Sequence, residues 1–460
     1  MRTFEVLLVV LIVLCALTIL VRKSARAVAL GLWVLAVVML LAHVILEGMH
    51  WQMAPAYAGV LLFAVTFAIR GRITRYVIAG AMLLLAAGAC VLSAFLPMFR
   101  LPAPTGHYLI GTQILYLVND HPPAHTVLRK DGTRELMIQV WYPASPSSAA
   151  RAPYRRLSET SLLSSYQSVL WTHARFNTPF AAGGSPFPLL LLDPEWNGRR
   201  TYFTYLVEDL VSHGYVVVGI DHTGNSGPTA FPDGHISQPD PDPGLDFESH
   251  TFAEVNAYGA QQQIVQVSDA RFVLDQLQRF NQDSSNWLYR HLDMDRVGAF
   301  GHSFGGSVSA QICLEDSRIK SALDMDGSLW GPVQQLGLAK PFMMIEEDVN
   351  LSPPPEQLKD PGAMISHLFD LSDAVMMSKS EGYHVTVHGS THSSFTDRSL
   401  FSPLKRYSGE GDIPASREYA IIREYALAFF EKTLNGRDSQ LLDGANHPFR
   451  ETSMEILRRR

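Results

Sequence analysis

The first hundred residues constrain the fold most, because they are apolar almost throughout and contain four long apolar runs. The runs cover residues 6–21, 27–46, 54–69 and 76–99. A helix needs about 20 apolar residues to cross a bilayer core of roughly 30 Å. The second and fourth runs meet this length, and the other two meet it if flanking residues such as Trp51 lie at the interface. We therefore expect four transmembrane helices within residues 1–100.

Two alternatives compete with four membrane spans. A buried helical core would explain all four runs, but none of them carries the polar face of a soluble amphipathic helix. A signal peptide would explain the first run alone, since Ser24-Ala25-Arg26-Ala27 resembles a cleavage site. Signal peptides, however, carry their positive charges before the apolar run, and here Arg22, Lys23 and Arg26 follow it.

The charges of the short loops predict the orientation of the spans. The Lys and Arg residues of the first and third loops are Arg22, Lys23, Arg26, Arg70, Arg72 and Arg75, and the second loop, residues 47–53, has none. The positive-inside rule places the first and third loops in the cytoplasm. Residues 101–460 are then extracytoplasmic. His43 lies near the end of the second run, so we expect an interfacial residue there, with a proton or ligand site as the alternative.

Composition excludes several classes of function. The net charge of −7 gives no reason to expect a nucleic-acid partner. The three cysteines are too few and too scattered for a disulfide framework or a metal site. Because the sequence contains no cluster of metal ligands and no nucleotide-binding loop, we expect neither metal nor cofactor.

Residues 101–460 show buried strands alternating with helices, after a Pro-rich linker at 101–104. The predicted strands are 135–142, 186–192, 215–221, 296–300, 319–325, 342–345 and 383–387, and the clearest helices are 257–280 and 418–434. Such alternation predicts an α/β fold with a mostly parallel sheet covered on both faces. A polar stretch at about 224–250 lacks periodicity, and we interpret it as a lid-like loop or a disordered surface insertion.

The chemistry centres on Ser303, in the sequence Gly301-His302-Ser303-Phe304-Gly305-Gly306. A Gly-x-Ser-x-Gly motif between a strand and a helix is typical of the nucleophile elbow of α/β-hydrolases. The strained turn exposes the serine hydroxyl at the end of the sheet, and the glycines let strand and helix approach closely. A tight structural turn is the alternative. We therefore predict that Ser303 is the nucleophile of a serine hydrolase.

A serine nucleophile needs a base and an orienting acid, and in this fold the chain order is serine, acid, histidine. Asp326 is our predicted acid because it ends a strand before a glycine turn; Asp324, on the strand itself, is the alternative. His392 is our predicted base because it lies in the loop beyond the last strand. His384 and His388, in or beside that strand, are weaker candidates.

The chain resembles the calcium-independent, plasma-type platelet-activating-factor acetylhydrolase family and its bacterial relatives, from about residue 106 to residue 392. The matching stretches are 106–112, Trp141-Tyr142-Pro143 with its neighbours, 212–217 and the elbow 301–306. The resemblance implies an α/β-hydrolase in which Ser303, Asp326 and His392 are nucleophile, acid and base. It also suggests short-acyl or oxidised phospholipids, or other small esters, as substrates.

The sequence departs from this family at residues 193–198. Where the family has Ser-His-Gly-x-Gly, this chain has Asp193-Pro194-Glu195-Trp196-Asn197-Gly198. This loop supplies one backbone N–H of the oxyanion hole, by position that of Trp196, and Phe304 supplies the other. Because Asp193 and Glu195 bring negative charge to the loop, reduced activity or an altered substrate is a possible consequence. The secreted family members also lack the four-span segment.

The sequence therefore predicts a membrane-anchored serine carboxylester hydrolase that forms an acyl-enzyme. An acyltransferase or peptidase on the same scaffold is one alternative. A non-catalytic membrane protein with a degenerate oxyanion hole is another. His302 neighbours the nucleophile, so its side chain points away from Ser303, and we expect it to have a packing role.

Overall fold

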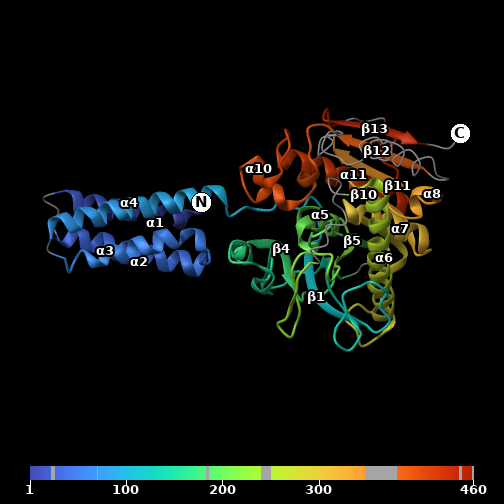
Figure 1. Ribbon diagram of the computed structural model, residues 1–460, viewed down its shortest axis with the longest axis horizontal. Helices are drawn as coiled ribbons and strands as arrows, with labels where there is room; N and C mark the ends of the chain where they lie inside the picture. The colour runs from blue at the N-terminus through green and yellow to red at the C-terminus, as the bar shows by residue number, and fades with distance from the viewer. Residues whose placement is uncertain are drawn as a thin grey trace. The chain divides into compact units, whose positions relative to one another are not determined.

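The computed structural model describes residues 1–21, 26–69, 71–182, 186–239, 250–347, 381–444 and 448–457. The chain divides into two compact units (Figure 1). The helical unit comprises residues 1–100 with 153–171 and 399–408. The sheet unit comprises residues 101–152, 172–398 and 409–460. Three of the charges used to predict the membrane orientation, Arg22, Lys23 and Arg70, lie outside the described residues.

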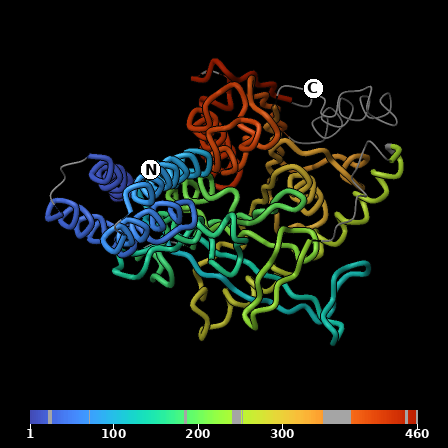
Figure 2. Tube along the Cα trace, turned by 60° about the vertical axis from the view of Figure 1, so that its left-hand side comes forward, coloured from blue at the N-terminus to red at the C-terminus, as the bar shows by residue number. Residues whose placement is uncertain are grey.

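The helical unit is built from four apolar helices that lie side by side in both views (Figures 1 and 2). They are α1 (Thr3–Leu20), α2 (Arg26–Leu46), α3 (Ala54–Val65) and α4 (Arg72–Phe95), and the short helices of this unit are η1 (Trp51–Met53), η2 (Leu157–Glu159), η3 (Ser165–Val169) and α10 (Lys405–Ser408). Of these, α1, α2 and α4 are long and apolar enough to cross a membrane.

The third apolar run forms a shorter helix than predicted. α3 has 12 residues, and with η1 the apolar helix covers only Trp51–Val65. It ends at Val65, and the N–H groups of the next three residues donate to carbonyls three residues back, at 3.0 to 3.2 Å, so the α-helical pattern stops there. A fourth membrane span therefore stays a prediction.

One end of the helical unit buries a cluster of charged and polar side chains. Arg2 Nε lies 2.6 Å from Glu5 Oε1, and His50 Nε2 lies 3.1 Å from the same oxygen. His43 is fully buried, and its Nδ1 lies 2.9 Å from Glu47 Oε2. Because Arg2 also approaches Glu47, at 4.0 Å, its guanidinium supplies the positive charge that the two carboxylates need.

The sheet unit is organised around a sheet of eleven strands in the described residues. Their order is β13-β12-β11-β10-β9-β5-β6-β2-β1-β4-β3. The strands are β1 (Leu109–Asn119), β2 (Arg134–Ala144), β3 (Arg151–Pro153), β4 (Trp171–Phe176), β5 (Phe187–Asp193), β6 (Val216–Asp221), β9 (Leu292–His302), β10 (Ile319–Met325), β11 (Phe342–Glu347), β12 (Gly382–Val387) and β13 (Thr452–Leu457).

The centre of this sheet is parallel, from β6 through β5, β9, β10 and β11 to β12. Strands β2 and β13 join it in the antiparallel sense on either side. The mostly parallel sheet predicted from the sequence is thus confirmed. Strands β1 and β13 were not predicted from the sequence. They pair antiparallel with β2 and β12, respectively, outside the parallel core.

Helices cover both faces of the sheet (Figure 1). One pair, α6 (Phe252–Gln282) and α7 (Phe304–Glu315), packs together against β9 and its neighbours, and α5 (Thr204–Ser212) packs with α11 (Ala415–Asn435). Gly298 on β9 lets α11 approach, because a Cβ there would lie 2.8 Å from the ring of Phe430. This layering buries the apolar strands on both faces and leaves their ends accessible.

The predicted lid-like region is partly packed into the fold. Residues 225–227 and 229–231 are buried, and β7 (Thr229–Ala230) and β8 (Ile236–Ser237) form a short antiparallel pair. Residues 240–249 lie outside the described residues. A lid function for this region stays a prediction. The remaining short elements are η4 (Arg200–Phe203), α8 (Val333–Leu336), η6 (His392–Phe395) and η7 (Asp397–Leu400).

Candidate active site

Ser303 occupies the turn between β9 and α7, with φ 54° and ψ −125°. Three of the six non-glycine residues with positive φ in the described ranges, Asn197, Ser303 and Asp326, belong to this site. Such conformations cost about 1–3 kcal/mol each and persist where the surrounding structure enforces them. Here the Ser303 N–H donates to the carbonyl of Met325 at 2.9 Å. The turn is therefore held by the neighbouring strand β10.

The glycines of the motif are required by close backbone contacts. A Cβ at Gly305 would lie 2.0 Å from the carbonyl oxygen of Asp193. A Cβ at Gly301 would lie 2.3 Å from the backbone of Gly305. The end of β5 thus touches the start of α7, and no side chain fits between them.

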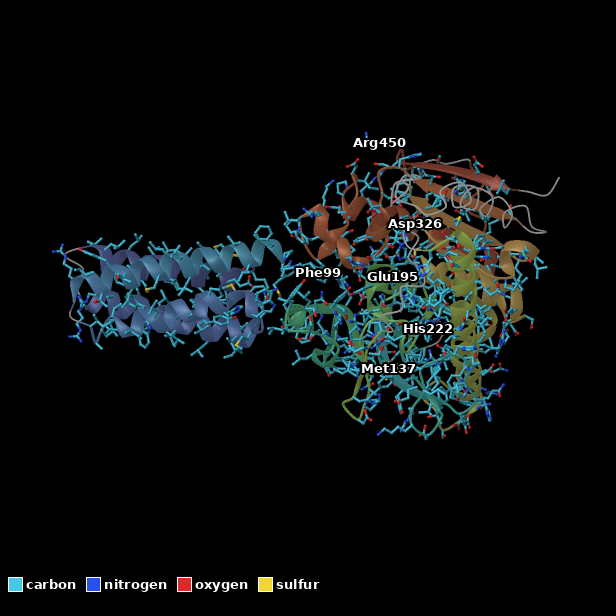
Figure 3. The ribbon with its side chains drawn as sticks, viewed as in Figure 1. Phe99, Met137, Glu195, His222, Asp326 and Arg450 are labelled. Carbon is cyan, nitrogen blue, oxygen red and sulfur yellow. The ribbon has the colours of Figure 1, made fainter. Side chains whose placement is uncertain are left out.

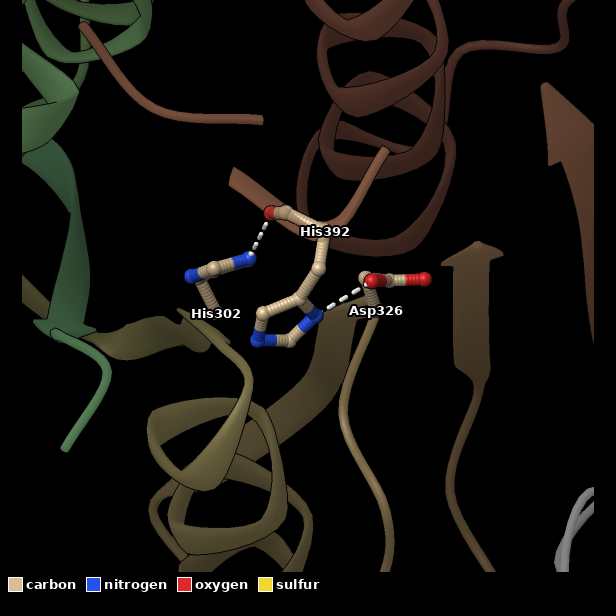
Figure 4. A group of neighbouring side chains, drawn as sticks. All are labelled: His302, Asp326 and His392. Carbon is tan, nitrogen blue, oxygen red and sulfur yellow. Dashed lines mark hydrogen bonds and ion pairs between the residues drawn. The ribbon is translucent and has the colours of Figure 1, made fainter. Parts of the chain in front are cut away.

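Asp326 and His392 are brought together from elements 66 residues apart (Figure 4). His392 Nδ1 lies 2.5 Å from Asp326 Oδ2, and the other carboxylate oxygen accepts the N–H of Glu347 at 2.8 Å. Burial raises the pKa of Asp326, but the hydrogen bond and charge of His392 outweigh burial and lower it. Burial lowers the pKa of His392, but Asp326 outweighs it and raises the pKa. Asp326 thus favours the imidazolium form of His392.

Apart from the contact of its Nδ1 with Asp326, the His392 side chain is largely exposed. Its side chain is 48% exposed, whereas that of Asp326 is 8% exposed. Within the described part of the chain, no hydrogen bond joins His392 to the Ser303 hydroxyl. Catalytic hydrogen bonds often tighten only when substrate binds.

The alternative acid, Asp324, has a different environment. It is fully buried on β10, and Cβ atoms at Gly306 and Gly327 would lie 1.7 Å and 2.4 Å from its Oδ1. Burial, reinforced by the nearby charge of Asp326, raises the pKa of Asp324 well above its usual range. Burial therefore favours the neutral form of Asp324. Of the other histidines, His384 pairs with Glu346 at 2.5 Å.

His302 does more than the packing role that its position in the sequence predicted. Its Nε2 donates to the backbone carbonyl of His392 at 2.8 Å, and the two rings lie 4.6 Å apart (Figure 4). This contact fastens the loop of His392 to the end of β9. Sequence reasoning missed it because the partner is a backbone atom 90 residues away.

The loop 193–198, where the sequence departs from its family, lies directly against the turn of Ser303. The Trp196 ring packs edge-on against that of Phe304, 5.4 Å between centroids. The loop is closed by two hydrogen bonds, from Asn197 N–H to Asn225 O at 2.8 Å and from Gly198 N–H to Glu195 O at 2.7 Å. The two residues predicted to donate to an oxyanion are thus neighbours.

A buried chain of charges holds the start of this loop. His222 Nε2 lies 3.1 Å from Asp193 Oδ1, and His222 Nδ1 lies 3.0 Å from Asp269 Oδ2. Asp269 in turn makes two hydrogen bonds with Arg134, of 2.7 and 2.6 Å. All four side chains are fully buried, and Figure 3 labels His222. Sequence reasoning missed this chain, although Asp193 and His222 lie at the ends of neighbouring strands.

The carboxylate of Asp193 is therefore paired through one oxygen with His222, and its other oxygen accepts from the Ser309 hydroxyl at 3.3 Å. Burial alone lowers the pKa of His222, but its hydrogen bonds to Asp193 and Asp269 raise it to about 9. This pKa favours the imidazolium form of His222 at neutral pH, whereas burial raises the pKa of Asp193 and the hydrogen bond with His222 opposes that rise.

The family model for platelet-activating factor acetylhydrolase, isoform II, matches residues 97–448. The chain belongs to this family. A probable 1-alkyl-2-acetylglycerophosphocholine esterase of Arthroderma benhamiae is 23% identical over 393 residues, 77% of this chain and 93% of the relative. The platelet-activating factor acetylhydrolase of the dog, Canis lupus familiaris, is 24% identical over 334 residues, 62% of this chain and 68% of the relative.

A solved ferulic acid esterase from Streptomyces cinnamoneus has a similar structure. Its TM-score is 0.60 at 27% identity, and the match covers 77% of this chain and 99% of that one. Family and structural neighbour together make the chain an ester hydrolase of the platelet-activating factor acetylhydrolase, isoform II, family. The alternative of a non-catalytic membrane protein is thereby set aside.

The buried charge chain generates a prediction for stability. Because the pKa of His222 in the folded protein, about 9, exceeds its ordinary value of about 6.5, His222 stabilises the fold fully below pH 6.5. This contribution is lost as the pH rises through 9. We expect the unfolding midpoint of the full-length protein in detergent to fall over this range.

Glu418, whose pKa burial raises to about 8, acts in the same direction at lower pH, so a His222→Gln variant isolates the histidine. The variant is expected to unfold at lower temperature at pH 7 and to lose less stability between pH 8 and pH 9.5. Parallel curves for the two proteins would contradict the assignment.

Proposed function

We propose that the chain is a membrane-anchored serine carboxylester hydrolase that uses Ser303, His392 and Asp326. The observation that carries this proposal is the 2.5 Å contact between His392 and Asp326, beside the strained turn of Ser303. In this arrangement Asp326 orients His392 and stabilises its charged form. The other ring nitrogen, Nε2, takes the Ser303 proton when substrate brings the two side chains together.

The reaction follows from these roles. Ser303 Oγ attacks the ester carbonyl, and His392 then gives its proton to the departing alcohol. An acyl-enzyme remains, and water activated by His392 hydrolyses it. The backbone N–H groups of Phe304 and Trp196 stabilise the tetrahedral intermediates, helped by the positive end of the α7 dipole.

The unusual sequence of the Trp196 loop is compatible with this chemistry. Backbone donors need the right loop shape rather than particular side chains. The packing of Trp196 on Phe304 and the pairing of Asp193 with His222 support such a shape. The negative charge of Asp193, which lies in this loop, is compensated by its hydrogen bond with His222.

The proposed substrates are short-acyl esters, phospholipid-type esters or other small esters. The named relatives act on 1-alkyl-2-acetylglycerophosphocholine and platelet-activating factor, and the structural neighbour is a ferulic acid esterase. What these names share is the hydrolysis of an ester. An acyl transfer to an added alcohol would instead favour the acyltransferase alternative.

Ser303→Ala is expected to abolish ester hydrolysis and labelling by a fluorophosphonate probe, because no other group supplies the attacking oxygen. The control is Ser317→Ala, an exposed serine just beyond the end of α7, which should retain both. Retained probe labelling in Ser303→Ala would refute the nucleophile.

Asp326→Asn and Asp324→Asn distinguish the two candidate acids. Asp326→Asn should lower kcat about 10³- to 10⁴-fold, because the amide neither fixes the His392 tautomer nor stabilises its charge. Asp324→Asn should remain within about tenfold of the wild type, because burial already favours the neutral form of Asp324, which the amide resembles. The reverse ranking in a p-nitrophenyl acetate assay would assign the acid to Asp324.

The membrane anchor and its orientation are a further part of the proposal. We propose that residues 1–100 span the membrane and that the sheet unit is extracytoplasmic. A cysteine placed at Pro104 should react with a membrane-impermeant maleimide in intact cells, and one at Gly71 should react only after lysis. The native cysteines are buried or partly buried. Labelling of Gly71→Cys in intact cells, or protection of Pro104→Cys, would contradict the proposed four-span orientation.

A further inference from the structure

Glu195 is a buried carboxylate beside the proposed active site that the proposed reaction does not use. Its side chain is 10% exposed, and neither of its carboxylate oxygens has a hydrogen-bond partner within the described residues (Figure 3). Its position is built into the loop, because a Cβ at Gly198 would lie 2.4 Å from its Cδ. A buried carboxylate without a partner costs several kcal/mol unless a charge or a proton compensates it.

The group that faces Glu195 is His302. His302 Nδ1 lies 3.7 Å from Glu195 Oε2 and has no hydrogen-bond partner within the same residues. Its other nitrogen, Nε2, bonds to the carbonyl of His392, which can only accept. Nε2 therefore carries a hydrogen, and in a neutral imidazole Nδ1 would present a lone pair to the carboxylate.

Two acceptors that face each other in a buried site repel, and one proton removes the repulsion. If the proton is on Nδ1, His302 is an imidazolium beside the Glu195 carboxylate. If the proton is on Glu195, its carboxyl group is a donor that faces Nδ1. Either form leaves the pair with no net charge. The negative charge of Glu195 in the oxyanion loop is then compensated by the neighbouring His302.

We propose that Glu195 and His302 hold one shared proton and act as a positioning pair, which fixes the Trp196 loop against the backbone of His392. Glu195 precedes Trp196 in the loop, and His302 holds the His392 carbonyl at 2.8 Å. The pair therefore joins the oxyanion donor to the general base. This inference rests on the proposed roles of Ser303 and His392.

Other ionisable groups interact with the pair or adjoin it. Asp326 interacts electrostatically with His302, the ring of His392 lies 4.6 Å from that of His302, and Asp193 lies two residues before Glu195 in the same loop. Glu195 itself is among the carboxylates that raise the pKa of His392, after burial, which lowers it, and Asp326 and Glu347, which raise it. Substitutions at Glu195 and His302 themselves are therefore needed to isolate the pair.

The pH profile of kcat/KM tests the shared proton. In the wild type, kcat/KM should rise as His392 loses its proton and fall at higher pH, when the pair loses its own and the loop shifts. In Glu195→Gln the amide donates to Nδ1 without ionising, so the part of the alkaline fall that is due to the pair should disappear, and only the part due to His222, whose pKa is about 9, should remain. Identical alkaline limbs in the two proteins would overturn the proposal.

His302→Gln supplies an independent test. The glutamine amide keeps a donor for the His392 carbonyl but leaves Glu195 without its partner, so kcat should fall by about tenfold or more. Adding Glu195→Gln to this variant should restore part of the loss, because the unpaired charge is removed. Losses that simply multiply would contradict a coupled pair, and this cycle decides the question even if one single variant folds poorly.

His173→Gln is the matched control. His173, on β4, is paired with the carboxylate of Glu208 at 2.7 Å. Its substitution should leave the alkaline limb unchanged, and loss of the limb there would also overturn the proposal. Probe labelling of Ser303 in each variant separates the two hypotheses. If Ser303→Ala still labels, the proposed nucleophile fails; if labelling is normal but the profiles coincide, only the positioning pair fails.

Discussion

The close approach of Gly305 to the carbonyl of Asp193 is the constraint on which the site depends. A Cβ at Gly305 would lie 2.0 Å from that oxygen, so the end of β5 and the start of α7 meet only without a side chain. The same contact fixes two things at once. It sets the turn that holds Ser303 at φ 54°, and it sets the point where the Trp196 loop leaves the sheet. Nucleophile and oxyanion loop are therefore placed relative to each other by backbone packing.

The carboxylates near this site are balanced in different ways. Asp193 and Asp269 have His222 between them and Arg134 beyond, and all four side chains are buried. Asp326 has His392, and burial raises the pKa of Asp324 and so favours its neutral form. In a medium of low dielectric, an unbalanced charge would disturb both the fold and the stabilisation of an oxyanion. The shared proton proposed for Glu195 and His302 extends the same principle to the last carboxylate of the loop.

Sequence reasoning reached the parts of the site that follow the chain order of the fold. Ser303 is marked by its glycines, Asp326 by its place at a strand end, and His392 by its loop beyond the last strand. The structure places the second and third in contact at 2.5 Å. The contributions of His222 and His302 were missed, because their partners lie 29 to 90 residues away and include a backbone carbonyl. The antiparallel strands β1 and β13 were missed as well, and α3 proved shorter than its apolar run.

The sequence by itself determined the apolar character of residues 1–100, the alternation of strands and helices after them, and the elbow of Ser303. These features are local, since they depend on periodicity, on strand length and on glycines within a few positions of each other. Only the tertiary structure decided which acid contacts His392, which groups pair with Asp193, and which group faces Glu195. Those outcomes depend on distances between atoms from different strands, and burial changes the protonation of such groups in ways that no local pattern encodes.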